Sequence, residues 1–189
     1  MDTDDAYLHG DYRDLFGSWS KDGKWLAYSK ITETNFERAY IYNTKTSESK
    51  AVSDPLAHVT DPTFDASGKY LYLAASTDAG PVVNWFQQSS NDMEATNSVY
   101  LLTLQNDEVS PLIRRNDTEE ITEEKGEDAG TKKDAKERKE EVEEKDESIR
   151  IDFDGIERRI VHLPIGSGNY SNLESAKAGE LLYLSRDDE

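Results

Sequence analysis

The chain has 189 residues, of which 35% are hydrophobic and none is cysteine, and it carries a formal net charge of −18 at pH 7. The acidic surplus argues against a nucleic-acid partner, which requires clustered Lys and Arg, and favours basic or cationic partners. The lack of cysteine excludes disulfide scaffolds, thiolate metal sites and cysteine nucleophiles. The hydrophobic content is low for a fully packed globule, so we expect part of the chain to lie outside any core.

The first residues, MDTDDAYLHGDYRD, are acidic where a secretory signal would be basic and then apolar. No apolar run approaches the roughly 20 residues that a membrane helix requires, so we expect no membrane span. A strand-like pattern begins soon after Met1, and we therefore expect the chain to be a fragment of a longer protein.

Residues 17–30, GSWSKDGKWLAYSK, predict a β-hairpin. Aromatic or aliphatic residues alternate with polar ones on both sides of the turn tetrapeptide Lys21-Asp22-Gly23-Lys24. Gly23 suits this turn because glycine takes backbone angles that other residues resist.

The same pattern recurs 45 residues later in DPTFDASGKYLYLAAS, residues 61–76. This offset aligns Trp19 with Phe64, Gly23 with Gly68, Trp25 with Tyr70 and Tyr28 with Leu73. Each copy is followed by a second similar unit, a strand, a polar turn and a shorter strand, at residues 38–53 and 98–112. Four strands in a repeat of about 40 to 45 residues are typical of a β-propeller blade.

We expect the aromatic residues of these hairpins to pack between neighbouring blades and not to stack on a ligand. Large flat side chains supply the apolar area that a narrow sheet cannot bury by itself. The residues concerned are Trp19, Trp25, Tyr28, Phe64, Tyr70 and Tyr72.

Residues 77–97 form a segment longer than a hairpin needs, and it contains Val82, Val83, Trp85 and Phe86. Long loops on a rigid scaffold often carry binding, so Trp85 and Phe86 are candidate contacts for a partner or a substrate. The alternative is that these two aromatic residues pack against the blade edge or an adjoining domain.

An acidic insert follows. Between Asp117 and Glu147 there are 15 acidic and 7 basic residues in 31 positions. Such a stretch cannot bury enough apolar surface to offset the entropy lost on ordering. We expect residues 114–148 to be disordered, with an acidic docking arm for a partner as the alternative.

The sequence after the insert resumes the strand pattern. Residues 149–164, IRIDFDGIERRIVHLP, predict a strand, a turn at Asp154-Gly155 and a strand that completes the interrupted sheet. Residues 168–185, GNYSNLESAKAGELLYLS, predict another hairpin in which Gly179 takes the place of Gly23.

The predicted fold class is all-β, a partial β-propeller of about two and a half four-stranded blades with WD-like or TolB-like repeats. We predict two blades over residues 1–113, the insert over 114–148, and the end of the second blade with the start of a third over 149–189. A closed propeller needs about four or more blades, so further blades must come from a larger protein or from other copies of the chain.

No catalytic residue is predicted. The chain has no G-x-S-x-G elbow, and Gly166-Ser167-Gly168 lies in a predicted connecting loop with the wrong spacing. The three histidines, His9, His58 and His162, are far apart in sequence. We interpret them as ordinary loop or strand residues, because nothing beside them supplies a nucleophile and an orienting partner.

No metal or cofactor site is predicted either. Asp152-Phe153-Asp154-Gly155 is similar to the start of a calcium loop, but the third acidic ligand and the distal glutamate are out of place. We interpret this stretch as a hairpin turn.

Five segments carry a family resemblance when taken in chain order. They are SWSKDGKWLAYSK, TFDASGKYLYLAASTDAGPVVNWF, SVYLLTLQNDEVSPL, the acidic insert and IDFDGIERRIVHLPIGSGNYSNL. Together they cover most of the chain and resemble the N-terminal propeller region of bacterial tricorn-type serine proteases. The DGK hairpins alone also occur in TolB-like and prolyl-oligopeptidase propellers, whereas TDAGPVVNWF, the charged insert and IDFDGIERRIVHLP in combination are more specific.

The resemblance implies a non-catalytic propeller fragment of a serine peptidase, which serves substrate access and assembly for the proteolysis of peptides. In that family a PDZ-like module and a catalytic domain follow later in the polypeptide. The implied partners are the remaining blades, those later domains, peptide substrates and further copies of the chain, and the implied location is the periplasm or cell envelope in preference to the cytoplasm. Two alternatives stay open: a TolB-like propeller that binds a protein partner, and the propeller of a prolyl-oligopeptidase-type hydrolase.

Limited proteolysis tests the expected disorder of the insert. Because a solvated, unpaired backbone is the preferred substrate of a protease, we expect the first cuts between Asp117 and Glu147. Mass spectrometry of the early fragments locates them. Full protection of this stretch, with first cuts elsewhere, would mean that its charges are docked.

Overall fold

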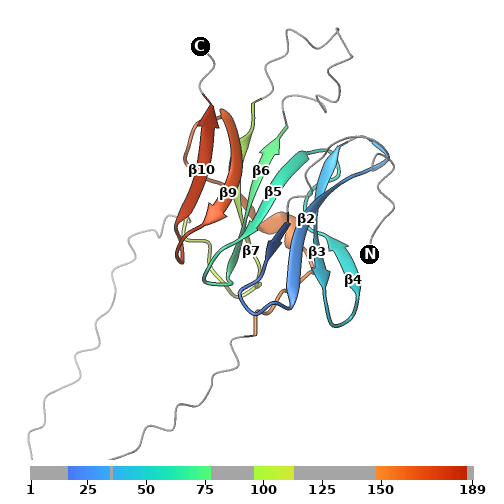
Figure 1. The fold of residues 1–189 in the computed structure, drawn as a ribbon. Helices are drawn as coiled ribbons and strands as arrows, with labels where there is room; N and C mark the ends of the chain where they lie inside the picture. The colour runs from blue at the N-terminus through green and yellow to red at the C-terminus, as the bar shows by residue number, and fades with distance from the viewer. Residues whose placement is uncertain (1–16, 35, 78–95, 113–147, 187–189) are drawn as a thin grey trace, which may run out of the picture.

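The computed structural model describes residues 17–34, 36–77, 96–112 and 148–186. In these ranges the chain forms ten β-strands and one short 3-10 helix, and no α-helix. The strands make three antiparallel sheets that stand side by side, with the second sheet between the first and the third (Figure 1). The prediction of an all-β fold that forms part of a β-propeller is confirmed.

The first sheet has four strands in the order β1-β2-β3-β4. They are β1 (Gly17–Trp19), β2 (Trp25–Ile31), β3 (Glu37–Asn43) and β4 (Glu48–Ala51). The turn between β1 and β2 is closed by the Ser20 N–H, which donates to the Trp25 carbonyl at 2.9 Å, and by the Gly23 N–H, which donates to the Ser20 carbonyl at 2.9 Å. Gly23 has a φ of 67°, as the turn prediction requires.

The second sheet repeats this arrangement in the order β5-β6-β7-β8. Its strands are β5 (His58–Phe64), β6 (Tyr70–Ser76), β7 (Ser98–Thr103) and β8 (Ile160–His162). Gly68 has a φ of 73° in the turn between β5 and β6. The fourth strand comes from the sequence after the insert, since β8 pairs with β7. The shorter strand expected within residues 98–112 does not form, because β8 occupies that edge of β7.

The third sheet is a hairpin of β9 (Asn169–Ser175) and β10 (Leu181–Arg186). Its turn contains Gly179 with a φ of 76°. The three turn glycines therefore share a positive φ, as expected for equivalent positions of one sequence repeat.

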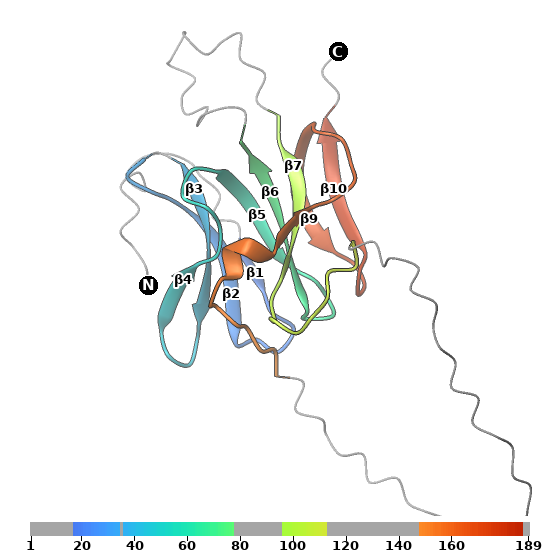
Figure 2. The same ribbon diagram turned by 180° about the vertical axis from the view of Figure 1, so that it is seen from behind.

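The strand predicted at the start of residues 149–164 is wrong. The Ile149 N–H donates to Asp22 Oδ2 at 3.0 Å, and the Ile149 carbonyl accepts from Trp25 Nε1 at 3.1 Å. Side chains of the first sheet thus occupy the backbone groups that a ladder would use, and the Asp152 N–H donates to the Leu104 carbonyl at 2.9 Å. The chain then forms a 3-10 helix, η2 (Ile156–Arg159), which packs between the first two sheets (Figure 2).

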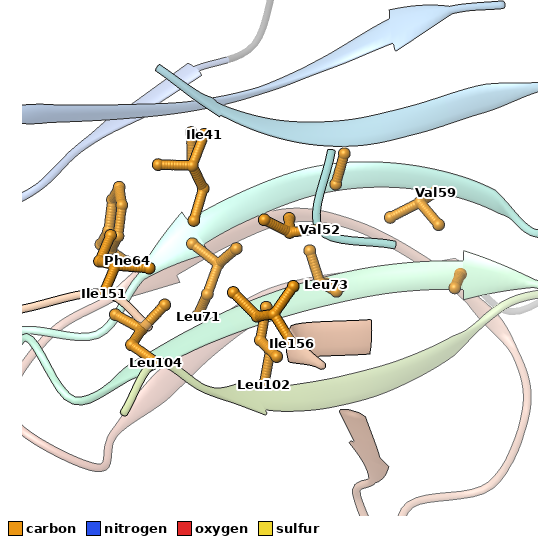
Figure 3. Close-up of a cluster of buried hydrophobic side chains, with 13 residues drawn as sticks. Ile41, Val52, Val59, Phe64, Leu71, Leu73, Leu102, Leu104, Ile151 and Ile156 are labelled. Atoms are coloured by element: carbon orange, nitrogen blue, oxygen red, sulfur yellow. The ribbon is translucent and has the colours of Figure 1, made fainter. Parts of the chain in front are cut away.

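The main core lies between the first and second sheets (Figure 3). Ile41 of the first sheet and Leu71 and Leu102 of the second are fully buried in it. A second cluster lies between the second and third sheets and joins Tyr72 to Leu173. The second sheet is thus apolar on both faces, which explains why β6 is buried along nearly its whole length.

The expected packing of aromatic residues between blades holds where a neighbouring sheet is present. Phe64 and Tyr72 are buried against the first and third sheets respectively. Trp19, at the position equivalent to Phe64, is 58% exposed, because no described sheet covers that face of the first sheet. Tyr28 stacks on Tyr40 of the same sheet, with ring centroids 5.8 Å apart.

A comparison of Gly68→Ala with Gly23→Ala tests the turn geometry. Both substitutions place a side chain at positive φ, which costs about 1 kcal/mol. At Gly68 the new Cβ would also lie 2.7 Å from Ile149 Cγ1, whereas nothing lies within 4 Å of that position at Gly23. We expect Gly68→Ala to lower the free energy of unfolding in urea by more than Gly23→Ala does.

Ile149→Ala removes the obstructing side chain and serves as the control for this comparison. In an Ile149→Ala background the two glycine substitutions should have equal costs. A difference that persists there would contradict the steric explanation.

Candidate functional site

The first strands of the three sheets lie next to one another: β1 contacts β5, and β5 contacts β9 (Figure 1). In a propeller the strands nearest the axis border the central channel. A groove of about 810 Å³ runs along these three strands. Its lining comes from the strands and their turns: Gly17, Ser18, Trp19, Lys21, Asp61, Pro62, Thr63, Phe64, Asp65, Ala66, Asn172, Leu173, Glu174 and Ser175.

Two β-bulges shape the floor of the groove. Asp61 has a φ of 50° and Asn172 a φ of 54°, although neither is glycine. In β5 the register with β6 shifts between Thr60 and Thr63, on either side of Asp61. Asp61 and Asn172 are 111 residues apart, which is the spacing of the turn glycines Gly68 and Gly179, so the bulges occupy equivalent positions of the repeat.

Hydrogen bonds at these bulges join β5 to β9. The Asn172 N–H donates to Asp61 Oδ2 at 3.1 Å, and the Thr63 hydroxyl donates to the Leu173 carbonyl at 2.8 Å. Burial raises the pKa of Asp61 above its ordinary value, and the bond from Asn172 only partly offsets this. Asp61 is therefore a carboxylate that a positively charged ligand would stabilise.

Asp65 is the buried carboxylate at the end of the groove, with only 1% of its surface exposed. It accepts hydrogen bonds from the Ser67 N–H at 2.8 Å, the Tyr72 hydroxyl at 3.2 Å and the Gly179 N–H at 2.8 Å. Burial by itself would raise the pKa of Asp65, but the bonds from Ser67, Gly179 and Tyr72 together lower it. Burial and the neighbouring Asp65 carboxylate raise the pKa of Tyr72. Asp65 is therefore ionised and fully engaged in structure.

The rim of the groove combines one exposed aromatic ring with charged side chains. Trp19 is exposed on the β1 side, and Glu174 is exposed on the β9 side. The Ser18 hydroxyl accepts from the Phe64 N–H at 3.1 Å and holds β1 against β5. The groove can thus contact an apolar side chain at Trp19 and attract a cation at Asp61 and Glu174.

A smaller pocket of about 300 Å³ lies at one end of the second sheet, where β6 ends and β7 begins, and its lining includes His162 and Ser167. The Ser167 hydroxyl pairs with the Ser98 hydroxyl at 2.9 Å. The His162 ring packs edge-on against Tyr100, with centroids 5.3 Å apart. The two residues share a pocket, but these contacts are not those of a nucleophile and its base.

The candidate contact residues Trp85 and Phe86, together with His9, lie outside the described residues. His58 accepts a hydrogen bond from the Glu37 N–H at 3.2 Å, which is a structural contact. Among the residues that the structure describes, no three His, Cys, Asp or Glu side chains gather as a metal site would require. The same residues include no helix long and apolar enough to cross a membrane.

Asp61, Asn172 and Glu174 were not identified as groove residues from the sequence. The available signal was the repeat itself, because the offset that aligns Gly68 with Gly179 also aligns Asp61 with Asn172. No glycine marks the bulge, so residue type alone does not reveal it.

No family model and no curated protein matches the chain. The crystal structure of the tricorn protease is similar to it over 85% of this chain, with 16% sequence identity and a TM-score of 0.49. The chain covers 14% of the length of that protein. A likeness of this extent carries no functional argument, and the groove is interpreted from its own residues.

The two groove aspartates should respond to pH in opposite directions. Because the pKa of Asp61 is raised on folding, its ionisation lowers stability as pH rises above the ordinary value of 3.8. The pKa of Asp65 is lowered, so its ionisation adds stability above 3.8 that is lost as pH falls through the folded value. As the pH rises from about 3 to about 7, the free energy of unfolding of Asp61→Asn should increase relative to that of the wild type, and that of Asp65→Asn should decrease.

Urea unfolding at several pH values measures both trends. Each variant is compared with the wild type by the slope of its stability difference against pH, which cancels any constant effect of the substitution. Slopes of the same sign would contradict the assignment.

Proposed function

We propose that this chain is a non-catalytic part of the β-propeller of a tricorn-type serine protease, and that its groove binds extended peptides on their way to a catalytic domain elsewhere in the protein. The family is proposed from the sequence resemblance, above all from TDAGPVVNWF, the charged insert and IDFDGIERRIVHLP. The single structural observation that supports it is the groove along β1, β5 and β9, the strands that would border a propeller channel.

The groove suits an unfolded peptide better than a small compact ligand. It follows three strands, and its lining mixes backbone, hydroxyl and aromatic groups with the acidic residues Asp61, Asp65 and Glu174 and one basic residue, Lys21. Exposed Trp19 offers a flat apolar contact of the kind that anchors peptides. Asp61 and Glu174 favour basic side chains or a free amino terminus, in keeping with the acidic composition of the chain.

Assembly with the remaining blades belongs to the same proposal. Within the described residues β10 of the third sheet pairs with β9 alone, so the other edge of β10 is open to a further strand of the same sheet. A location in the periplasm or cell envelope remains part of the proposal through the resemblance alone.

Peptide binding tests the role of the groove. We expect fluorescently labelled, unstructured peptides rich in Lys to bind the chain in fluorescence anisotropy without being hydrolysed. Trp19→Ala should weaken binding roughly tenfold, about 1.4 kcal/mol, because it removes the exposed aromatic contact. Val109→Ala is the matched control, since Val109 is 62% exposed and lies outside the groove lining.

Equal affinities for Trp19→Ala and the wild type would contradict binding at the groove. Serine-dependent hydrolysis of the peptides by this chain would contradict its non-catalytic role. Replacing Lys by Glu in the peptide should weaken binding at low salt. Equal affinities for the two peptides would contradict the attraction of basic side chains by Asp61 and Glu174.

A further inference from the structure

The turn of the third sheet is one residue shorter than the turns of the other two. In the first two turns the closing bonds run from the Ser20 N–H to the Trp25 carbonyl at 2.9 Å and from the Asp65 N–H to the Tyr70 carbonyl at 3.0 Å. The equivalent donor in the third turn is the Ala176 N–H. It donates to the Glu180 carbonyl at 3.2 Å, one residue earlier than the repeat requires.

The shorter turn shifts the strand register by one residue. In the first two sheets Trp19 lies opposite Leu26 and Phe64 opposite Leu71. The third sheet places Ser175, the next equivalent of Trp19 and Phe64, opposite Leu181 and not opposite Leu182. A shift of one residue turns each side chain of a strand to the other face of the sheet.

The shift exposes residues that the repeat would bury. Leu71 and Leu73 of β6 are 0% and 1% exposed, whereas their equivalents in β10, Leu182 and Leu184, are 58% and 60% exposed. In their place Leu181 packs against the cluster between the second and third sheets.

Two features of the sequence and structure account for the short turn. The Gly179 N–H donates to Asp65 Oδ1 at 2.8 Å, whereas the equivalent Gly23 and Gly68 donate to the first residue of their own turns. The third turn also lacks the side chains that stabilise the first. There the Ser20 hydroxyl donates to Asp22 at 2.6 Å and accepts from the Trp25 N–H at 3.0 Å.

The residues equivalent to Ser20 and Asp22 are Ala176 and Ala178, which have no polar side-chain atoms. The longer turn is therefore stabilised in the first hairpin and unsupported in the third. Asp65 of the second sheet holds the third hairpin in the shorter form.

We propose that the free edge of β10 is a docking surface for a third antiparallel strand of the same sheet, and that docking moves the β9–β10 hairpin by one residue into the register of the other sheets. Within the described residues β10 pairs with β9 alone. The same edge of β2 is covered by β3, and that of β6 by β7, over six or seven residue pairs. The occupant is thus a strand of the same kind, with apolar residues at alternate positions.

The driving force is the burial of Leu182 and Leu184. In the register of the other two sheets, Leu182 and Leu184 would face the second sheet. Their equivalents Leu71 and Leu73, which face the first sheet, are fully buried. A docked strand also satisfies the backbone groups along β10. Without a neighbouring strand, the bond from the Gly179 N–H to Asp65 favours the shorter turn.

The test supplies the strand within the same molecule. Residues 35–43, NFERAYIYN, are appended directly after Glu189, so that β10 is followed by a five-residue connection like the one between Ile31 and Glu37. A tethered strand has a high effective concentration. The control carries the same extension with proline in place of its isoleucine, because proline cannot complete the ladder.

NMR reports the register directly, since facing residues of a non-hydrogen-bonded antiparallel pair bring their α-protons close together, with Cα atoms about 4.5 Å apart. In the unextended chain and the proline control we expect a contact between the α-protons of Ser175 and Leu181. In the extended chain we expect it to be replaced by a contact between Ser175 and Leu182. If the appended strand pairs with β10 while the Ser175–Leu181 contact persists, docking does not move the register and the proposal is wrong.

A second variant tests the explanation of the short third turn without adding a strand. Ala176→Ser with Ala178→Asp reproduces the first turn, Ser20-Lys21-Asp22-Gly23, in the third hairpin. We expect it to raise the population with the Ser175–Leu182 contact and to reduce the protection of the Gly179 amide from hydrogen exchange. No change in either observable would overturn the explanation of the short turn.

Sedimentation of the unextended chain separates the proposed occupant from a second copy. A monomer is expected. A dimer in which β10 pairs with its counterpart in another molecule would overturn the assignment of this edge to a strand of the same sheet.

Discussion

Face-to-face packing of narrow sheets is the constraint on which this structure depends. No sheet in the described part of the chain has more than four strands, and each buries its apolar side chains against a neighbouring sheet. Leu71 faces the first sheet while the adjacent Tyr72 faces the third, so strict alternation along β6 serves two interfaces at once. Loss of register in one hairpin therefore disturbs the packing on both sides of it.

Carboxylates add the directional contacts that apolar packing lacks. Asp22 accepts from the backbone of Ile149, Asp61 from Asn172, and Asp65 from Gly179. Each of these bonds joins a turn or bulge of one sheet to chain that is more than a hundred residues later in the sequence. Hydrogen bonds to an ionised acceptor are short and geometrically demanding, so they specify where the later segment must lie. Apolar contacts alone would allow it to slide.

Local patterns were sufficient to predict the hairpins, because each depends on alternation within about fifteen residues and on a glycine at positive φ. They were not sufficient for residues 149–155. That stretch alternates like a strand, yet Asp22 and Trp25 occupy the backbone groups of Ile149. An interaction between residues so far apart leaves no local signal. Trp19 shows a related limit, since its burial depends on whether a further sheet covers it.

The groove was less predictable than the fold, because it arises where first strands of different sheets meet. Comparison of the sequence copies separates two kinds of position. The turn carries glycine in every copy, at Gly23, Gly68 and Gly179, whereas the position that aligns with the bulge carries Phe16, Asp61 and Asn172. Positions that the fold constrains keep one residue type, and this position does not.

The bulge itself does not demand an acid, because Asn172 adopts the same positive φ with a neutral amide. The carboxylate at Asp61, whose pKa is raised by burial, is therefore a property of this groove and not of the repeat. Asp61 is a partly buried acid that already accepts a hydrogen bond from Asn172, and a cationic ligand in the groove would further stabilise its charged form.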